Sequence, residues 1–267
     1  MPTQSKFTPD RTLIGMVHVG ALPGTPKHSQ SISTIVSTAV AEAKLLQQAG
    51  FDAIIIENMH DAPYVHGPRL GPEIVAGMTR VATEAAAVVT IPIGIQILSG
   101  GNTHAMAVAH STGCSFIRCE NFVYAHVADE GLLAEAEAGP LLRERKRTGA
   151  QSVAVFADIK KKHASHAITA DISIEDTAHA AAFFGADGLV VTGKWTGSPA
   201  DPNDAKAAKR TSGLPVLVGS GVDPSNICDM LAEADGVIVG SSIKEGGLWS
   251  NPVCAEKAAA LIAAARA

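Results

Sequence analysis

The sequence predicts a single (β/α)8 barrel, and three observations support this. The chain of 267 residues alternates alanine-rich, helix-forming stretches with short apolar runs, and eight such units can be traced. The apolar runs are continuous instead of alternating, which is typical of parallel strands covered on both faces. No stretch rich in Pro, Gly or Ser is long enough to separate two domains, and barrels of this class reach about 250 residues as one unit.

The strands are expected where an apolar run follows a turn. Five follow a glycine or similar turn at a helix end, since glycine supplies the left-handed cap: Ala53–Glu57, Cys114–Glu120, Ser152–Asp158, Gly188–Thr192 and Gly236–Gly240. The other three are expected at Thr12–His18, Ile93–Leu98 and Val216–Gly219. Residues 1–10 are expected to form a flexible segment ahead of the barrel domain, which spans 11–267.

The helices are expected between these strands. The candidates are Ser33–Ala49, Pro72–Val89, Thr103–His110, Leu132–Arg147, Ser173–Phe184, Asp201–Thr211, Pro224–Ala232 and Pro252–Ala265. The fourth is expected to be interrupted at Gly139-Pro140, because proline breaks the helical hydrogen-bond pattern. The rival architecture is an open doubly wound sheet, but His18–Gly24 lacks the G-x-G-x-x-G spacing that would follow its first strand.

Composition excludes several classes of function. With 21 basic and 26 acidic residues the net charge is −5, which offers no strong positive field to a nucleic acid. The apolar stretches are far shorter than the ~20 residues of a membrane span, and the first residues lack an apolar signal core. The four cysteines show no C-x-x-C spacing, which favours free thiols in a reducing compartment. We therefore expect a cytoplasmic protein with no nucleic-acid or membrane partner.

Ionisable residues gather at the carboxyl ends of the predicted strands, where barrels of this class hold their active sites. Such groups are costly to bury without a ligand or partner, although some polar residues must occur wherever a strand leaves the core. The candidate catalytic residues are His18, Glu57, Asn58, Arg118, Glu120, Asp158, Lys160, Lys162 and His163.

Two glycine- and serine-rich triplets follow the seventh and eighth predicted strands. Loops at these positions form the recurrent phosphate site of the fold, because glycine lets backbone amides approach an anion and hydroxyl groups add donors. The alternative is that both triplets are ordinary tight turns. The candidate phosphate-binding residues are Gly219, Ser220, Gly221, Gly240, Ser241 and Ser242, with Lys244 adding positive charge.

Strand alternation suggests how these groups are paired. Asp158 and Lys160 have the same parity and are expected to face the lumen together. A lysine beside a carboxylate can move a proton or, when desolvated, act as a Schiff-base nucleophile; the alternative is a solvated basic loop. Arg118 and Glu120 also share parity, which favours a lumen salt bridge or a catalytic role for this pair.

Metal binding has little support in the sequence. The carboxylates at the strand ends could hold a divalent metal together with His18. However, the first strand ends in His18-Val19-Gly20 instead of the H-x-H of barrel metal sites. We therefore expect no metal and no other cofactor.

Five phrases of the sequence resemble the BtpA/SgcQ family. They are Ile14–Gly24, Ile56–Asn58 with Asp61–Tyr64, Ile117–Asn121, Ala157–Ala164 and Val218–Val222. The similarity runs from about residue 11 to residue 262. It implies a barrel of the ribulose-phosphate-binding group that uses the candidate residues named above, with Ile159 where typical members have valine. The family's name comes from a role in photosystem I biogenesis, and the genes of other members lie beside sugar-metabolism genes. The resemblance implies no settled reaction.

Two functions remain open at this point. The first is a cofactor-independent isomerase, epimerase or lyase acting on a phosphorylated sugar or a nucleoside-like phosphate, since such reactions need only proton transfers beside a carbonyl. The alternative is a BtpA-like, non-catalytic assembly or stability factor of the photosystem I biogenesis type. A third hypothesis places a flavin or nucleotide phosphate in the same loops. The apolar outer helices also lead us to expect a homo-oligomer.

Overall fold

Eight parallel strands close into a barrel in the order β1-β11-β10-β9-β7-β4-β3-β2. The structure is a computed structural model that describes residues 6–267. The barrel strands are β1 (Thr12–His18), β2 (Ala53–Glu57), β3 (Ile93–Gln96), β4 (Phe116–Cys119), β7 (Ala154–Ile159), β9 (Gly188–Thr192), β10 (Val216–Gly219) and β11 (Gly236–Val239). The predicted (β/α)8 architecture is confirmed.

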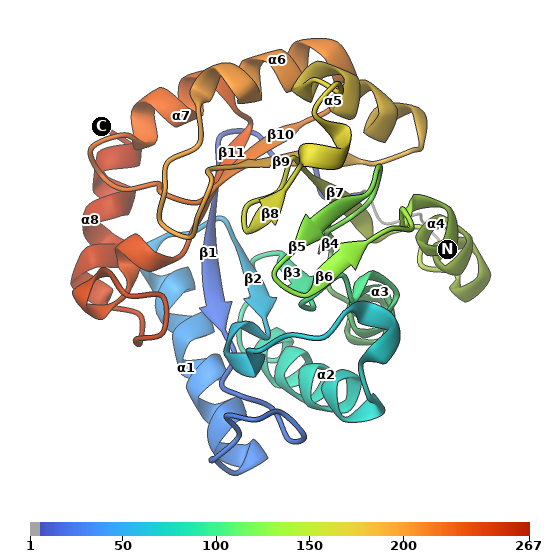
Figure 1. The fold of residues 1–267 in the computed structure, drawn as a ribbon. Helices are drawn as coiled ribbons and strands as arrows, with labels where there is room; N and C mark the ends of the chain where they lie inside the picture. The colour runs from blue at the N-terminus through green and yellow to red at the C-terminus, as the bar shows by residue number, and fades with distance from the viewer. Residues whose placement is uncertain (1–5) are drawn as a thin grey trace.

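Helices surround the barrel on its outside (Figure 1). They are α1 (Ile32–Ala49), α2 (Pro72–Ala86), α3 (Asn102–Thr112), α4 (Ala138–Thr148), α5 (Ile174–Phe183), α6 (Pro202–Ser212), α7 (Ile227–Glu233) and α8 (Ala255–Ala265). Short 3-10 helices lie in the loops: η1 (Met59–Asp61), η2 (Gly67–Arg69), η3 (Ala167–Thr169), η4 (Ser241–Ile243) and η5 (Glu245–Gly247). Within residues 6–267 we find no helix of the length and apolarity that a membrane crossing requires.

The largest departure from the predicted elements lies between β4 and α4. The predicted helix Leu132–Arg147 is wrong in its first part, because the chain there forms β5 (His126–Ala128) and β6 (Gly131–Leu133). Gly131 has a φ of 110° at the start of β6, a conformation that favours glycine. Pro140 lies in the first turn of α4, where a missing amide hydrogen is tolerated, so it marks the start of the helix and not an interruption.

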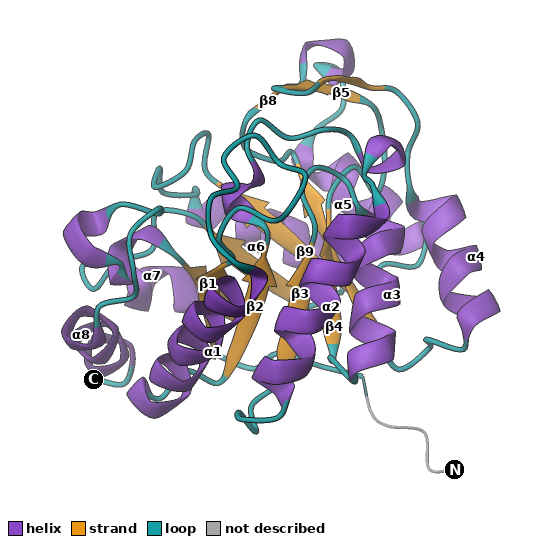
Figure 2. Cartoon of the chain, turned by 90° about the horizontal axis from the view of Figure 1, so that it is seen from below, coloured by secondary structure: helices purple, strands orange, loops and turns teal. Residues whose placement is uncertain are grey.

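A small antiparallel sheet covers one end of the barrel. Its strands are β6, β5 and β8 (Ala164–Ser165), with β5 in the centre. Figure 2 shows β5 and β8 projecting beyond the barrel strands and helices. Since β5 follows β4 and β8 follows β7, this sheet stands at the carboxyl ends of the strands, which we call the mouth.

The core has two layers. An outer layer packs the strands against the helices, and an inner layer fills the barrel with side chains that include Phe116, Phe156 and Ile238. The two rings occupy space left by glycines of neighbouring strands, since a Cβ on Gly94 or Gly188 would lie 2.3 Å from a ring carbon. The strand register places three polar strand-end residues side by side at the mouth, because His18 pairs with Glu57 and Glu57 with Gln96.

The segment before β1 also contributes to the inner layer. Residues 1–5 of the expected flexible segment lie outside the described residues. Phe7 stacks on Phe116 with 4.4 Å between ring centroids and meets Phe156 edge-on. Lys6 forms an ion pair with Asp187. These contacts join the described part of the segment to the barrel.

Candidate functional site

The mouth contains two adjoining cavities with a common wall. The cradle lobe, of about 220 Å³, is lined by Ser220–Asp223 and Gly240–Ser242 after β10 and β11, and by Met16 and His18 of β1. The charged lobe, of about 250 Å³, lies over β2, β3, β4 and β7. Five residues line both lobes and form the common wall: Glu57, Met59, Arg118, Lys162 and Thr196. The two lobes can therefore hold two parts of one ligand.

His18 and Glu57 form an acid–base pair on adjacent strands. The Nδ1 of His18 lies 2.8 Å from the carbonyl oxygen of Trp249, and because a carbonyl only accepts, Nδ1 carries the hydrogen. Burial lowers the pKa of His18 to about 3, so the ring is neutral and Nε2 is a bare acceptor. Nε2 lies 3.5 Å from Oε2 of Glu57. Burial also raises the pKa of Glu57, which favours the protonated form of the carboxyl group that faces this nitrogen.

Arg118 pairs with Asp158 across β4 and β7. Its Nε and Nη2 donate to the carboxylate at 2.9 to 3.2 Å, and both side chains are buried. The predicted pairing of Arg118 with Glu120 is therefore wrong. Glu120 lies beyond the end of β4 and accepts from Nζ of Lys161 at 2.9 Å and from the amide of Gly100 at 2.8 Å. Burial opposes ionisation of Glu120, but the ammonium of Lys161 outweighs it and holds the pKa below its usual value.

The three consecutive lysines after Asp158 and Ile159 point to different places. Lys160 has a φ of 48°, which breaks the strand alternation and turns its Nζ to the carbonyl oxygen of Thr169 at 3.1 Å. Lys160 lines neither lobe of the mouth and shares only a separate cavity of about 20 Å³ with Asp158, so its predicted position facing the lumen is wrong. Lys161, which the sequence did not single out, is tied to Glu120. Lys162 reaches the common wall, and burial together with the charge of Arg118 lowers its pKa.

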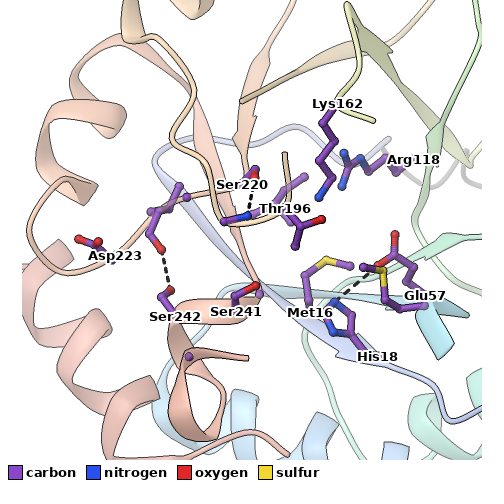
Figure 3. A pocket seen from close by; sticks show the side chains of 17 residues that line it. Met16, His18, Glu57, Arg118, Lys162, Thr196, Ser220, Asp223, Ser241 and Ser242 are labelled. Carbon is purple, nitrogen blue, oxygen red and sulfur yellow. Dashed lines mark hydrogen bonds and ion pairs between the residues drawn. The ribbon is translucent and has the colours of Figure 1, made fainter. Parts of the chain in front are cut away.

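The cradle lobe presents backbone amides from two loops. The amides of Gly221, Val222, Ser241 and Ser242 donate to no protein acceptor within residues 6–267. The hydroxyl of Ser241 has no protein partner there either. Unpaired amides that converge on a concave surface favour an anion. The carboxylate of Asp223 is held by the amide and hydroxyl of Ser225 and points away from the lobe (Figure 3).

Other hydroxyls of the cradle lobe hold the loops together. Ser220 Oγ donates to the carbonyl of Trp195 and accepts from the amide of Gly197. Ser242 Oγ donates to the carbonyl of Val222 at 2.6 Å. Gly219 lies within β10 and does not line the lobe. The side chains of these serines are therefore positioning groups.

The predicted role of Lys244 in the cradle is wrong, because its side chain turns away from the lobe. Its Nζ donates to Oε2 of Glu42 on α1 at 2.9 Å, and the lysine side chain is 1% exposed. The same carboxylate accepts from the amide of Val253. This buried pair fixes the segment after η4 to α1.

Asn58 and His163 serve mainly to hold loops. Asn58 is fully buried, lines neither lobe, and its side chain bonds to Asp61 and to the amide and carbonyl of Leu98. His163 lines the charged lobe, and its Nε2 lies 2.8 Å from the hydroxyl of Thr196. Nδ1 of His163 lies 3.6 Å from Asp129, at the turn of the small sheet.

Sequence reasoning missed several residues that line the charged lobe. Tyr64, Asp129, Glu130 and Trp249 come from loops distant in sequence, and no spacing signal connects them to the strand ends. Gln96 ends β3, and its Oε1 is buried without a hydrogen-bond partner in the described chain. Across residues 6–267, His, Cys, Asp and Glu side chains form no group of three or more suited to a metal ion.

Comparisons with known proteins agree with the fold. The model of the BtpA family matches residues 9–267. An uncharacterized mitochondrial protein of Caenorhabditis elegans is 45% identical over 248 residues, covering 90% of this chain and 87% of the relative. The photosystem I biogenesis protein BtpA of Synechocystis is 34% identical over 244 residues, covering 90% and 83%.

A solved structure of low identity shares the barrel. Orotidine 5'-monophosphate decarboxylase from Methanocaldococcus jannaschii, complexed with the inhibitor BMP, superimposes with a TM-score of 0.61. The identity is 13%, and the match covers 97% of this chain and 100% of that one. At this identity the likeness shows the fold alone.

Proposed function

The chain belongs to the BtpA family, and from this premise we propose that it is an enzyme acting on a small phosphorylated compound, a sugar phosphate or a nucleoside-like phosphate. The observation that carries the proposal is the placement of free loop amides in one lobe and the His18–Glu57 pair on the wall shared with the other. A phosphate in the cradle lobe would place the rest of the ligand against that wall.

Charge and hydrogen bonding support an anion in the cradle lobe. The amides of Gly221, Val222, Ser241 and Ser242 offer donors from two loops. Lys162 and Arg118 enter the space from the opposite side (Figure 3), and the guanidinium of Arg118 brings a positive charge. An anion there satisfies donors that otherwise have no protein partner. The name of the structural neighbour also refers to a monophosphate, which agrees with the proposal.

The common wall supports proton transfer beside a carbonyl. A protonated Glu57 can donate to a substrate oxygen, and His18 Nε2 can take up a proton, because a neutral imidazole accepts at that nitrogen. Gln96 adds an acceptor for a hydroxyl group of the ligand. Isomerisation, epimerisation and lyase cleavage all fit such a pair. That the reaction needs no cofactor stays a prediction, as does the homo-oligomer.

Ligand binding is tested by thermal unfolding against a library of sugar phosphates and nucleotides. A ligand at 100 times its Kd should stabilise the protein by about 2.7 kcal/mol. The variant Ser241→Asp places a carboxylate among the free amides and should abolish the shift. The control Ser33→Asp adds the same charge on exposed α1 and should keep it. The proposal fails when no compound stabilises the wild type, or when both variants respond alike.

A second candidate function rests on the name of the Synechocystis relative, a photosystem I biogenesis protein. By analogy, this chain would act as an assembly or stability factor without catalysis. The variant Glu57→Gln separates the two, because it preserves shape but removes the proton. If a deletion strain complemented with Glu57→Gln grows like the wild type while a surface variant does not, the assembly role is favoured.

A further inference from the structure

Lys162 differs from the two lysines that precede it. Lys160 donates to a backbone carbonyl outside both lobes, and Lys161 is paired with Glu120. Lys162 has no hydrogen bond or ion pair from its Nζ to any residue of 6–267, although it lines both lobes. A lysine without a partner at the wall of a cavity is available to a ligand.

The surroundings of Lys162 hold its backbone in place and lower the pKa of its side chain. Its amide donates to the hydroxyl of Thr192 at 3.0 Å, which fixes the backbone beside β9. Burial and the nearby guanidinium of Arg118 lower its pKa, which increases the fraction of neutral amine. Arg118 is itself engaged by Asp158, and its protonated guanidinium is no nucleophile toward a carbonyl carbon. Glu57 lines the same two lobes, and burial raises its pKa, which favours the protonated carboxyl group.

We propose that Lys162 forms a Schiff base with the carbonyl group of a small phosphorylated aldehyde or ketone sugar whose phosphate lies on the free amides of the cradle lobe. The inference rests on the proposed function and adds a reaction class to it. Figure 3 shows Lys162 reaching in from the side of the pocket opposite Ser241 and Ser242, so one ligand can meet both.

The chemistry balances without an oxidant or reductant. The neutral amine of Lys162 adds to the carbonyl carbon, and one proton moves from nitrogen to the former carbonyl oxygen. Glu57 donates a proton to this hydroxyl group, which leaves as water, and takes up the second proton of the nitrogen as the C=N bond forms. When protonated, the imine draws electrons from an adjacent C–H or C–C bond, as isomerases, epimerases and lyases require.

The test is chemical trapping on the full chain. The protein is incubated with dihydroxyacetone phosphate, glyceraldehyde 3-phosphate or ribulose 5-phosphate, reduced with sodium borohydride, and mapped by peptide mass spectrometry. With at least one compound, the reduced adduct should lie on Lys162 and not on Lys160 or Lys161, whose amines are held by Thr169 and Glu120. Inorganic phosphate in excess should lower the yield.

Two variants separate this inference from the proposed function. Lys162→Arg keeps the positive charge but forms no imine, so it should lose the adduct and keep a thermal shift with the trapped compound. Lys160→Arg should keep both. If a compound stabilises the wild type and Lys162→Arg but leaves no adduct on Lys162, the Schiff base is refuted and the proposed function stands. Equal labelling of all three lysines also refutes it, and when no compound is trapped or stabilising, both proposals fail.

Discussion

His18 shows how burial sets the protonation state of a single residue at the mouth. Burial lowers its pKa to about 3, whereas the unfolded chain takes up this proton near 6.5. Because the folded-state pKa is depressed, the neutral ring contributes its full stability above about pH 6.5. That contribution is lost as the pH falls toward 3, where the unfolded state binds one proton more.

Replacing His18 should therefore flatten the acid side of the stability curve. For His18→Asn, the slope of the free energy of unfolding between about pH 6 and pH 4 should fall by up to about 1.4 kcal/mol per pH unit. Urea unfolding at several pH values measures this slope. The control His179→Asn, on exposed α5, should retain the wild-type slope. An unchanged slope for the first variant would show that the ring is not held neutral.

Burial also decides how much an ion pair contributes to the free energy of unfolding. Arg118 and Asp158 are 6% and 1% exposed, so removing one partner leaves an uncompensated charge in the barrel. We expect Asp158→Ala to lower the free energy of unfolding by about 3–5 kcal/mol. The pair between Lys206 and Glu233 is largely exposed, and Glu233→Ala should cost less than about 1 kcal/mol. Denaturant titration of the two variants compares them, and similar losses would contradict this account.

Among the elements, the loops after β9 and β10 are tightly fitted to each other. Gly221 has a φ of 65°, and a Cβ there would lie 2.3 Å from the backbone nitrogen of Pro199. Gly193 meets the same loop, since its Cβ would lie 2.1 Å from the carbonyl oxygen of Ser198. The cradle lobe therefore depends on Gly221, which brings the two loops together, and on Gly193, which lets the loop after β9 fold back on itself.

Substitution at Gly221 should disrupt the cradle lobe as well as the fold. Gly213 offers a matched control, because its φ is 67° but a Cβ would have no atom within 4 Å. We expect Gly213→Ala to cost about 1–2 kcal/mol through its left-handed backbone alone. Gly221→Ala should cost more and should weaken the thermal shift by phosphorylated ligands. Equal loss in the two variants, with ligand binding preserved, would mean that the loops can move apart.

For the whole molecule, the barrel is filled at one end by aromatic side chains and left open at the other. Phe7, Phe116 and Phe156 pack together in the inner layer of the core. The mouth is lined instead by ionisable groups, with the small sheet above it. The aromatic packing and the ligand-lining groups are therefore separated along the barrel axis.

Truncation of Phe7 tests this separation. Phe7→Ala removes a partly buried ring and a stacked aromatic pair, and we expect a loss of about 2 kcal/mol in the free energy of unfolding. The dissociation constant of any ligand found at the mouth should stay unchanged. Phe183→Ala, whose ring is 80% exposed on α5, is the control and should change neither quantity. A weakened ligand affinity in Phe7→Ala would show that the two ends are coupled.

The local sequence pattern was sufficient to predict most of the fold. The bounds of β1, β2, β9 and β10 agree with the prediction, because continuous apolar runs and preceding turns are properties of adjacent residues. The pattern failed between β4 and α4, where short strands form a sheet with β8 through pairing across the chain. Pairing between segments that are distant in sequence leaves little trace in the local pattern of either segment.

The sequence by itself determined which strand end carries each ionisable residue, and hence that His18, Glu57, Arg118 and Asp158 meet at one mouth. Only the tertiary structure decided their partners. It joined Arg118 to Asp158 instead of Glu120, and it left the Nζ of Lys162 without a partner among residues 6–267. The alternation of side chains along a strand no longer predicts which way a residue faces once the backbone enters a left-handed conformation. Ion pairing, in turn, depends on distances between residues that are far apart in the chain.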